Sequence, residues 1–234
     1  ASSDKKNHEK FLKLLSDLEF GEEKPRRKMI LIGGFYGVGK SSLAIKLAKG
    51  LGYKRFNSDI SRREFKLDKY NLEDGDVVWG TIHLKAGLEL NRGKGVIIES
   101  TYLDEHQRHF EYDIALNNKS DIIFIEVICP ESVAKSRINA REITPDGFHV
   151  PTNRIEFYDK KKDLWKNPIP ELNKFNRSHI SYLIYDSSKN KLFEALLRNN
   201  HKKLAEEIAQ TLGLDLEKAD NTLINSEKRY EIGI

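Results

Sequence analysis

Short apolar runs alternate with amphipathic stretches along most of the chain. The mainly apolar runs predict strands at 29–32, 96–98, 121–129 and 182–185, and 55–57 is a further short strand candidate. Apolar residues at helical spacing predict helices between them, at 41–51, 81–91, 104–117 and 131–142. This alternation predicts an α/β fold, with a parallel sheet, right-handed crossovers and helices on both faces.

The same pattern divides the chain into three parts. Residues 1–27 are expected to form an N-terminal helix and a charged connector, because 4–19 carry Phe11, Leu12, Leu14, Leu15 and Leu18 among charged residues. Residues 28–190 are expected to form the α/β core, with a helical lid at about 137–170. Residues 191–234 are expected to form a C-terminal helical extension, since 191–213 show the apolar spacing of one or two helices.

The strongest chemical signal follows the first predicted strand. Gly34 to Ser41 fits G-x-x-x-x-G-K-[ST] at every fixed position, and a helix is predicted directly after it. Glycines let successive N–H groups turn toward one anion, and the helix N-terminus adds its dipole. The expected phosphate-binding residues are Gly34, Tyr36, Gly37, Val38, Gly39, Lys40, Ser41 and Ser42.

Lys40 and Ser41 distinguish this motif from a glycine-rich turn without a ligand. Lys40 is expected to reach the β- and γ-phosphates of a nucleotide, and the Ser41 hydroxyl is expected to ligate Mg²⁺. A turn without a ligand would explain the glycines but not these two side chains. The predicted cofactors are therefore ATP and Mg²⁺.

Asp59 and Arg62 follow the predicted strand 55–57. At that strand end, Asp59 could accept the proton of an acceptor hydroxyl, and Arg62 could bind an anionic acceptor. The alternative makes Asp59 a helix N-cap and Arg62 a solvated surface residue. Sequence alone leaves both open.

Arg137 and Arg141 lie four residues apart, on one face of the predicted helix 131–142. Two guanidinium groups before a glycine-containing turn suit a lid that neutralises a phosphoryl group in transit, and Arg154 is expected to join them. A solvated helix face is the alternative, but the phosphate loop favours the lid.

Glu99 and Thr101 end the predicted strand 96–98. Glu99 could hold a metal-bound water or an acceptor hydroxyl, or it could cap the following helix. Both interpretations remain open, and Thr101 is expected to contribute to the same acceptor site.

Composition limits the partners. The chain has 234 residues with 40 Lys and Arg against 36 Asp and Glu, a net charge of +4 that suits an anionic substrate but is too small to indicate wrapping of nucleic acid. The single cysteine, Cys129, predicts a reducing, cytoplasmic location and a buried apolar role. No apolar stretch approaches the roughly 20 residues that span a bilayer, so no membrane partner is expected.

From about Met29 to Asn190 the chain resembles the zeta-toxin-like branch of P-loop kinases. The resemblance is carried by the phosphate loop and by five further segments in matching order, 56–60, 98–101, 137–141, 147–151 and 185–188. It implies a kinase-type α/β core, ATP with Mg²⁺ as donor, and a small anionic acceptor, which in the toxins is a nucleotide-activated amino sugar. It also admits an antitoxin-type protein partner.

Carried over by position, the resemblance makes Asp59 the general base, Lys40 the phosphate-binding lysine, Arg137 or Arg141 the lid arginine, and Glu99 the acceptor-binding acid. The lid departs from the family pattern, because Asp146-Gly-Phe-His stands where Gly-Gly-His is common. The related 5′-hydroxyl polynucleotide kinases usually carry Asp at the position of Ser100, which favours the zeta-like side.

The leading hypothesis is an ATP-dependent kinase that moves the γ-phosphate to a hydroxyl of a small phosphorylated acceptor, such as a nucleotide sugar. One alternative is a polynucleotide 5′-hydroxyl kinase, which the modest net charge disfavours. The alternative from another class is a nucleotide-binding switch, or an ATPase without an acceptor.

Overall fold

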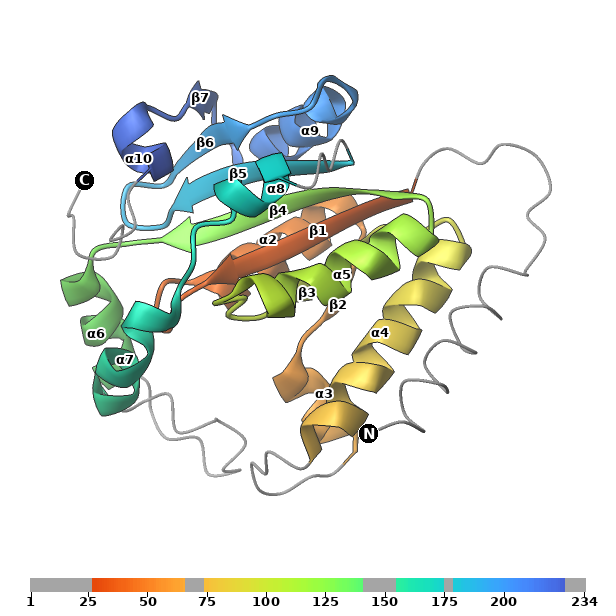
Figure 1. Cartoon of the computed structure of the whole chain (residues 1–234), viewed down its shortest axis with the longest axis horizontal. Coiled ribbons are helices and arrows are strands. Elements are labelled where there is room, and N and C mark those ends of the chain that lie inside the picture. Colours follow the sequence, from red (N-terminus) through yellow and green to blue (C-terminus); the bar gives the residue numbers. More distant parts are fainter. Residues whose placement is uncertain (1–26, 66–73, 141–154, 175–178, 226–234) are drawn as a thin grey trace.

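The described structure is built around one seven-stranded sheet. It is a computed structural model that describes residues 27–65, 74–140, 155–174 and 179–225. The strand order is β2-β3-β1-β4-β5-β6-β7, and every neighbouring pair is parallel except β5 and β6. Figure 1 shows helices on both faces of this sheet. The α/β fold predicted from the sequence is confirmed.

The strands are β1 (Arg27–Gly34), β2 (Lys54–Phe56), β3 (Val96–Glu99), β4 (Ser120–Ile128), β5 (Ile180–Asp186), β6 (Lys191–Leu196) and β7 (Leu216–Lys218). The helices are α2 (Lys40–Leu51), α3 (Ser58–Glu64), α4 (Gly75–Asn91), α5 (Glu105–Asn117), α6 (Glu131–Asn139), α7 (Ile155–Lys161), α8 (Ile169–Lys174), α9 (Lys202–Leu212) and α10 (Asn221–Asn225). Two short 3-10 turns, η2 (Lys162–Leu164) and η3 (Asn199–His201), precede α8 and α9.

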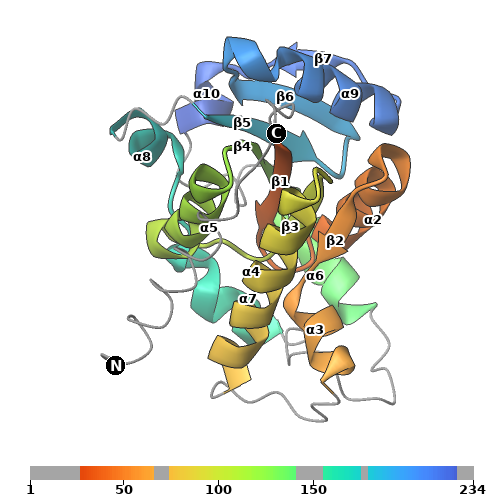
Figure 2. The same ribbon diagram turned by 90° about the vertical axis from the view of Figure 1, so that its right-hand side faces the viewer.

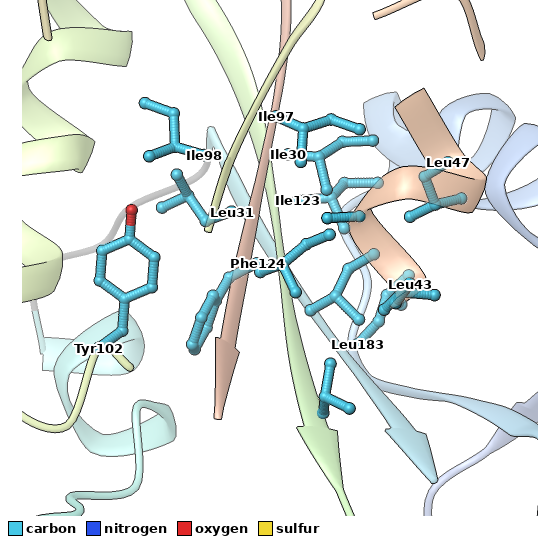
Figure 3. Close-up of a cluster of buried hydrophobic side chains, with 14 of the residues drawn as sticks. Ile30, Leu31, Leu43, Leu47, Ile97, Ile98, Tyr102, Ile123, Phe124 and Leu183 are labelled. Atoms are coloured by element: carbon cyan, nitrogen blue, oxygen red, sulfur yellow. The ribbon is translucent and has the colours of Figure 1, made fainter. Parts of the chain in front are cut away.

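The core follows from the alternation of side chains along the central strands. Leu31 lies in register with Ile98 and Phe124, and these side chains point to the face that holds Tyr102 (Figure 3). The residues one position earlier point to the other face, against α2; they are Ile30, Ile97 and Ile123. Because the side chains on both faces are apolar, the sequences of the central strands are nearly continuous hydrophobic runs.

Different helices cover the two faces of the sheet. Helices α4 and α5 pack on one face, and α2 packs with α9 on the other (Figure 2). The α2–α9 contact is close, since a Cβ added at Gly50 would come within 2.2 Å of Thr211 Cγ2. Lys46 Nζ also donates to the carbonyl oxygen of Leu212 at 2.9 Å. The helix that follows the phosphate loop is thus braced by the C-terminal part of the chain.

A fully hydrogen-bonded ion pair joins α5 to α8. Arg108, which is 0% exposed, donates from Nε and Nη2 to the two carboxylate oxygens of Glu171, at 2.7 and 2.8 Å. Its Nη1 donates to the carbonyl oxygen of Tyr102 at 2.8 Å, and the Tyr112 hydroxyl donates to Glu171 Oε1 at 3.1 Å. Burial lowers the pKa of Arg108, but the hydrogen bonds and charge of Glu171 outweigh this and raise it overall.

The structure differs from the sequence prediction at residues 191–196. A helix was expected there, but these residues form β6, which pairs antiparallel with β5 and extends the sheet beyond residue 190. Asn190 adopts a left-handed conformation with φ 54°, which suits a tight turn between two strands. The apolar spacing after this turn fits a strand as well as a helix. Within 191–213, the predicted α-helix is present only as α9.

The expected lid lies only partly within the described residues. Helix α6 ends at Asn139, and α7 begins at Ile155. Two of the predicted lid residues, Arg141 and Arg154, lie outside the described ranges. Among the described helices, none is both long and apolar enough to cross a lipid bilayer.

Candidate functional site

The loop between β1 and α2 forms the first part of the site. Gly39 is the N-cap of α2 in a left-handed conformation, with φ 102°, and no side chain caps the first turn. Gly37 also has a positive φ of 76°, and a Cβ there would lie 2.5 Å from the carbonyl oxygen of Ala134. A helix start without a side-chain cap, preceded by left-handed glycines, presents backbone N–H groups to an anion.

Lys40, Ser41 and Ser42 form the first turn of α2. Lys40 Nζ donates to the carbonyl oxygen of Phe35 at 2.7 Å, so the ammonium group folds back over the loop. Ser41 and Ser42 are exposed at the same helix end. The residues that the sequence predicts to bind phosphate therefore lie on one loop and the helix start that follows it.

A pocket of about 400 Å³ lies beside this helix start. It is lined by Gly37, Gly39, Ser42, Leu43, Lys46, Arg137, Tyr185 and Ser187. The walls therefore come from the loop, α2, α6 and the end of β5. Its position next to the phosphate loop suits the remainder of a nucleotide.

Arg137 ties α6 to both sides of this pocket. Its Nη1 donates to the carbonyl oxygen of Val38 at 3.2 Å and to Ser187 Oγ at 2.8 Å, and its Nη2 donates to the carbonyl oxygen of Ser187 at 3.3 Å. The Ser187 hydroxyl also donates to the carbonyl oxygen of Val38. Arg137 is therefore not on a solvated helix face, because its guanidinium group spans the phosphate loop and the β5–β6 turn.

Cys129 lies behind this region as a buried side chain, 2% exposed. Burial raises the pKa of its thiol, although the charge of Arg137 and a hydrogen bond with Ser187 act in the opposite direction. A buried thiol with a raised pKa is a poor nucleophile. The structure agrees with the apolar role expected from the sequence.

Glu99 is the centre of a second polar cluster, at the end of β3. Its Oε1 accepts hydrogen bonds from Arg55 Nη2 and Asn57 Nδ2. Its Oε2 is buried and has no hydrogen-bond partner among the described residues. The cap of α5 is Asp104, which accepts from the backbone N–H of Gln107 at 2.9 Å, so Glu99 does not cap that helix.

Asp59 and Arg62 lie on α3, beside this cluster. Asn57 is the N-cap of α3 and accepts from the backbone N–H of Ile60 at 2.7 Å, so Asp59 is not the cap. Arg62 is only 4% exposed, and its Nη1 lies 3.6 Å from Asp74 Oδ2 at the start of α4. The interpretation of Arg62 as a solvated surface residue is therefore wrong.

The phosphate loop and the polar cluster around Glu99 lie at the same end of the sheet, where β1 and β3 end. The backbone N–H of Gly34 donates to the carbonyl oxygen of Thr101 at 3.1 Å, which joins the phosphate loop to the segment after Glu99. Strand β3 lies between β1 and β2, so Asp59 follows a strand that is two positions from the loop, roughly 10 Å at normal strand spacing. The space between the phosphate loop and Asp59 can therefore hold a donor phosphate next to an acceptor hydroxyl.

Sequence reasoning missed three residues of the site: Arg55, Asn57 and Ser187. Asn57 and Ser187 stand in segments that carried the family resemblance, but neither was assigned a role. Arg55 gave no local signal, because its partner Glu99 lies 44 residues away and reaches it only through the pairing of β2 with β3.

The strand order β2-β3-β1-β4-β5, with the phosphate loop after β1, defines a P-loop fold of the kinase type. The sequence profile of a family described as "AAA domain" matches residues 29–161, and the chain belongs to this family. No curated protein matches the sequence significantly.

Several solved structures have a similar fold. One, from the characterization of the PezAT chromosomal toxin-antitoxin system of Streptococcus pneumoniae, is 15% identical, with a TM-score of 0.50 over 95% of this chain and 91% of that one. A sugar kinase from a Janibacter species is 18% identical, with a TM-score of 0.47 over 69% and 86% of the two chains. An APS kinase from Mycobacterium tuberculosis is 20% identical, with a TM-score of 0.43 over 50% and 70%. At these identities the likeness concerns the fold.

Proposed function

We propose that the protein is an ATP-dependent kinase that transfers the γ-phosphate to a hydroxyl of a small anionic acceptor. The observation that carries the proposal is that two polar groups of residues lie at the same end of the sheet, a phosphate loop with Lys40 and a polar cluster around the buried Glu99. A switch or an ATPase without an acceptor needs the first cluster only. The second cluster therefore favours a transferase.

The loop and α2 supply the donor side. The backbone N–H groups from Gly37 to Ser42 would bind the phosphates, and Lys40 would exchange its contact with Phe35 for the β- and γ-phosphate oxygens. Ser41 offers a hydroxyl at the helix start as a ligand for Mg²⁺, which would neutralise charge on those oxygens. Arg137 would hold the nucleotide from the side of α6, and Arg141 remains the proposed lid arginine.

The residues after β2 and β3 supply the acceptor side. The acceptor oxygen bonds to the γ-phosphorus, the bond from that phosphorus to the β,γ-bridging oxygen breaks, and ADP leaves. Asp59 takes the hydroxyl proton. Glu99 would accept a hydrogen bond from another acceptor hydroxyl through its buried Oε2, with Thr101 beside it. Arg62 and Arg154 would bind the anionic part of the acceptor.

For the acceptor we favour a nucleotide-activated amino sugar, as in the zeta-toxin-like kinases that the motifs resemble. The fold likeness to the structure from the PezAT system is compatible with this choice. The guanidinium group of Arg55 occupies Glu99 Oε1, which makes Glu99 a weaker metal ligand and favours a role in accepting hydrogen bonds from hydroxyl groups of the acceptor. An antitoxin-type protein partner belongs to the same proposal.

An acceptor screen with γ-labelled ATP tests the proposal. Purified protein is incubated with ATP, Mg²⁺ and one acceptor at a time: a nucleotide-activated amino sugar such as uridine-diphosphate N-acetylglucosamine, an oligonucleotide with a free 5′-hydroxyl, or an extract of small metabolites. We expect label in the amino sugar. Label only in the oligonucleotide would identify a polynucleotide kinase, and ATP consumption that no acceptor stimulates would identify an ATPase or switch.

Two variants separate binding from chemistry. Lys40→Ala should lose most nucleotide binding in calorimetry, because the ammonium group contacts the terminal phosphates. Asp59→Asn should bind ATP normally but transfer phosphate at least about 100-fold more slowly, as expected when a general base is lost. If Asp59→Asn transferred phosphate at the normal rate, Asp59 would not be the base.

A further inference from the structure

Glu111 is a second buried carboxylate with an unused oxygen atom. It lies on α5 and is 1% exposed. Its Oε1 accepts a hydrogen bond from the Tyr102 hydroxyl at 2.9 Å and lies 3.1 Å from His83 Nε2. Its Oε2 is buried and has no hydrogen-bond partner among the described residues. Since nearly all buried polar atoms are hydrogen-bonded, this oxygen atom needs an explanation.

Tyr102, which holds Glu111 on one side, has a strained backbone. Its φ of 48° lies in the left-handed region, which a bulky side chain rarely adopts. Such a conformation persists only where the surrounding structure holds it, and it is most common at ligand sites. Here Arg108 Nη1 donates to the carbonyl oxygen of Tyr102 at 2.8 Å, and Glu111 binds its hydroxyl. Contacts at both ends of the residue therefore keep its hydroxyl on Glu111.

His83, which holds Glu111 from α4, is fixed by aromatic neighbours. Its ring stacks on that of Phe110 with the centroids 4.9 Å apart, and the centroid of the Trp79 ring lies 5.8 Å away. Its side chain is only 11% exposed. The Glu111 carboxylate is thus oriented from two directions before any ligand binds. Such preorganisation lowers the entropy cost of binding.

Tyr102 also connects Glu111 to the acceptor side of the proposed kinase. It directly follows Thr101, whose carbonyl oxygen accepts from the backbone N–H of Gly34 in the phosphate loop at 3.1 Å. Burial and, after it, the charges of Glu111 and Glu99 raise the pKa of the Tyr102 hydroxyl. Both carboxylates therefore act on the same hydroxyl group. Glu111 lies close to the Glu99 cluster, on the side of α4 and α5.

We propose that Glu111 is a second acceptor-binding residue, whose Oε2 accepts a hydrogen bond from a hydroxyl or amide N–H group of the acceptor. This inference rests on the proposed kinase function. Since Oε2 is buried, the acceptor would reach it through the side-chain rearrangements that commonly accompany binding.

Two carboxylates define the chemistry of the acceptor end that they bind. An ionised carboxylate only accepts hydrogen bonds, and it repels phosphate. Glu99 and Glu111 together therefore select an uncharged group with at least two hydrogen-bond donors, as the sugar of a nucleotide-activated amino sugar has. The phosphates of such an acceptor would lie away from this pair, toward Arg62.

Calorimetry of the full chain with uridine-diphosphate N-acetylglucosamine, without ATP, tests the contact. Glu111→Gln should bind this ligand about tenfold more weakly than the wild type, because a charged hydrogen bond is lost. The matched control is Asp113→Asn, which removes the same charge from an exposed residue on a different face of α5 and should bind like the wild type. Equal affinities of the wild type and Glu111→Gln, as expected if a buried water fills the position, would overturn the proposal. The absence of binding to the wild type would overturn it as well.

Stability separates a ligand contact from a structural role. The amide oxygen of Glu111→Gln can still accept from Tyr102 and His83, so its urea midpoint and its affinity for ATP should equal those of the wild type. A lower midpoint together with weaker ATP binding would overturn the proposal in favour of a structural role.

Phosphate transfer from γ-labelled ATP is measured separately, so that the two proposals can fail independently. Binding that depends on Glu111, without transfer by the wild type, would support the subsite and contradict the kinase function. Transfer with the same kcat/KM for the acceptor in the wild type and in Glu111→Gln would contradict the subsite and leave the kinase function standing.

Discussion

Two pairs of arginine with a buried glutamate differ in how completely they are hydrogen-bonded. In the pair of Arg108 and Glu171, both carboxylate oxygens accept from the guanidinium group, and Tyr102 and Tyr112 complete the set. In the pair of Arg55 and Glu99, Oε2 of the glutamate and Nε of the arginine are buried without a hydrogen-bond partner among the described residues. A complete network is suited to holding helices together, whereas an incomplete one retains capacity for a ligand.

Their positions support the same distinction. Arg108 and Glu171 join two helices, α5 and α8, while Glu99 ends β3 beside the phosphate loop. The first pair is therefore expected to contribute mainly to stability, and the second mainly to acceptor binding. Four measurements test this division, beginning with the largest expected effect.

Replacement of Arg108 by Met should have the largest effect on stability. It leaves the Glu171 carboxylate buried without its cation, which costs about 3–5 kcal/mol of unfolding free energy. Urea denaturation followed by circular dichroism measures the loss. Arg108→Met combined with Glu171→Met should recover most of it, because an apolar pair leaves no buried charge. If the double variant were as unstable as the single one, packing rather than charge would explain the loss.

Replacement of Arg55 by Gln should mainly reduce activity. Without the guanidinium group, Glu99 loses a fixed orientation, so kcat/KM for the acceptor should fall about 10- to 100-fold, equivalent to about 1.4–2.7 kcal/mol. The KM for ATP and the urea midpoint should change little. Arg55→Lys, which keeps the positive charge, should recover part of the loss. A fall in stability as large as that of Arg108→Met would remove the distinction between the two pairs.

Replacement of Glu99 by Gln tests the free carboxylate oxygen directly. The amide keeps the shape but presents a weaker acceptor, so kcat/KM for the acceptor should fall about tenfold, as for loss of a charged hydrogen bond. Calorimetry with ATP serves as the control and should show unchanged affinity. Unchanged transfer rates would mean that Oε2 of Glu99 does not contact the acceptor.

The smallest expected effect concerns Tyr102, which contacts Arg108 and follows the Glu99 segment. Burial, followed by the charge of Glu111, raises the pKa of its hydroxyl well above the ordinary value of 10.0. The unfolded chain loses this proton first as pH rises, so the contribution of Tyr102 is full below about pH 10 and is lost above it.

In Tyr102→Phe, the unfolding free energy should therefore decline less steeply between pH 10 and 11 than in the wild type. Urea titrations at pH 9, 10 and 11 measure the slope. Tyr53→Phe is the comparison, because burial raises the pKa of Tyr53 to about 12 at a position outside both pairs. Identical slopes for Tyr102→Phe and the wild type would show that Tyr102 ionises as freely in the folded protein as in the unfolded chain.

The sequence predicted the parts of the site that are formed by local structure. The phosphate loop is one continuous segment, and its neighbouring strand and helix have clear apolar periods, so both its position and its fold could be read directly. Asp59, Arg62 and Glu99 were predicted on similar grounds, because Glu99 ends β3 and the other two residues follow the end of β2.

The rest depends on contacts between distant residues. The role of Arg55 exists only because β2 lies beside β3, and the hairpin of β5 and β6 exists only because β5 provides an edge for pairing. Neither strand pairing can be predicted from the local pattern of apolar and polar residues. Likewise, Asp59 and Glu99 are excluded as helix caps only by their neighbours Asn57 and Asp104, which occupy the caps of α3 and α5.

The contact between α2 and α9 has a practical consequence for protein production. The matched family region ends at residue 161, while α9 spans Lys202–Leu212. A fragment trimmed to the family boundaries would lose the neighbour of Gly50, the partner of Lys46, and β5, the strand that pairs with β4 on one side. Expression trials should therefore retain the chain at least through α9, because shorter fragments are expected to aggregate.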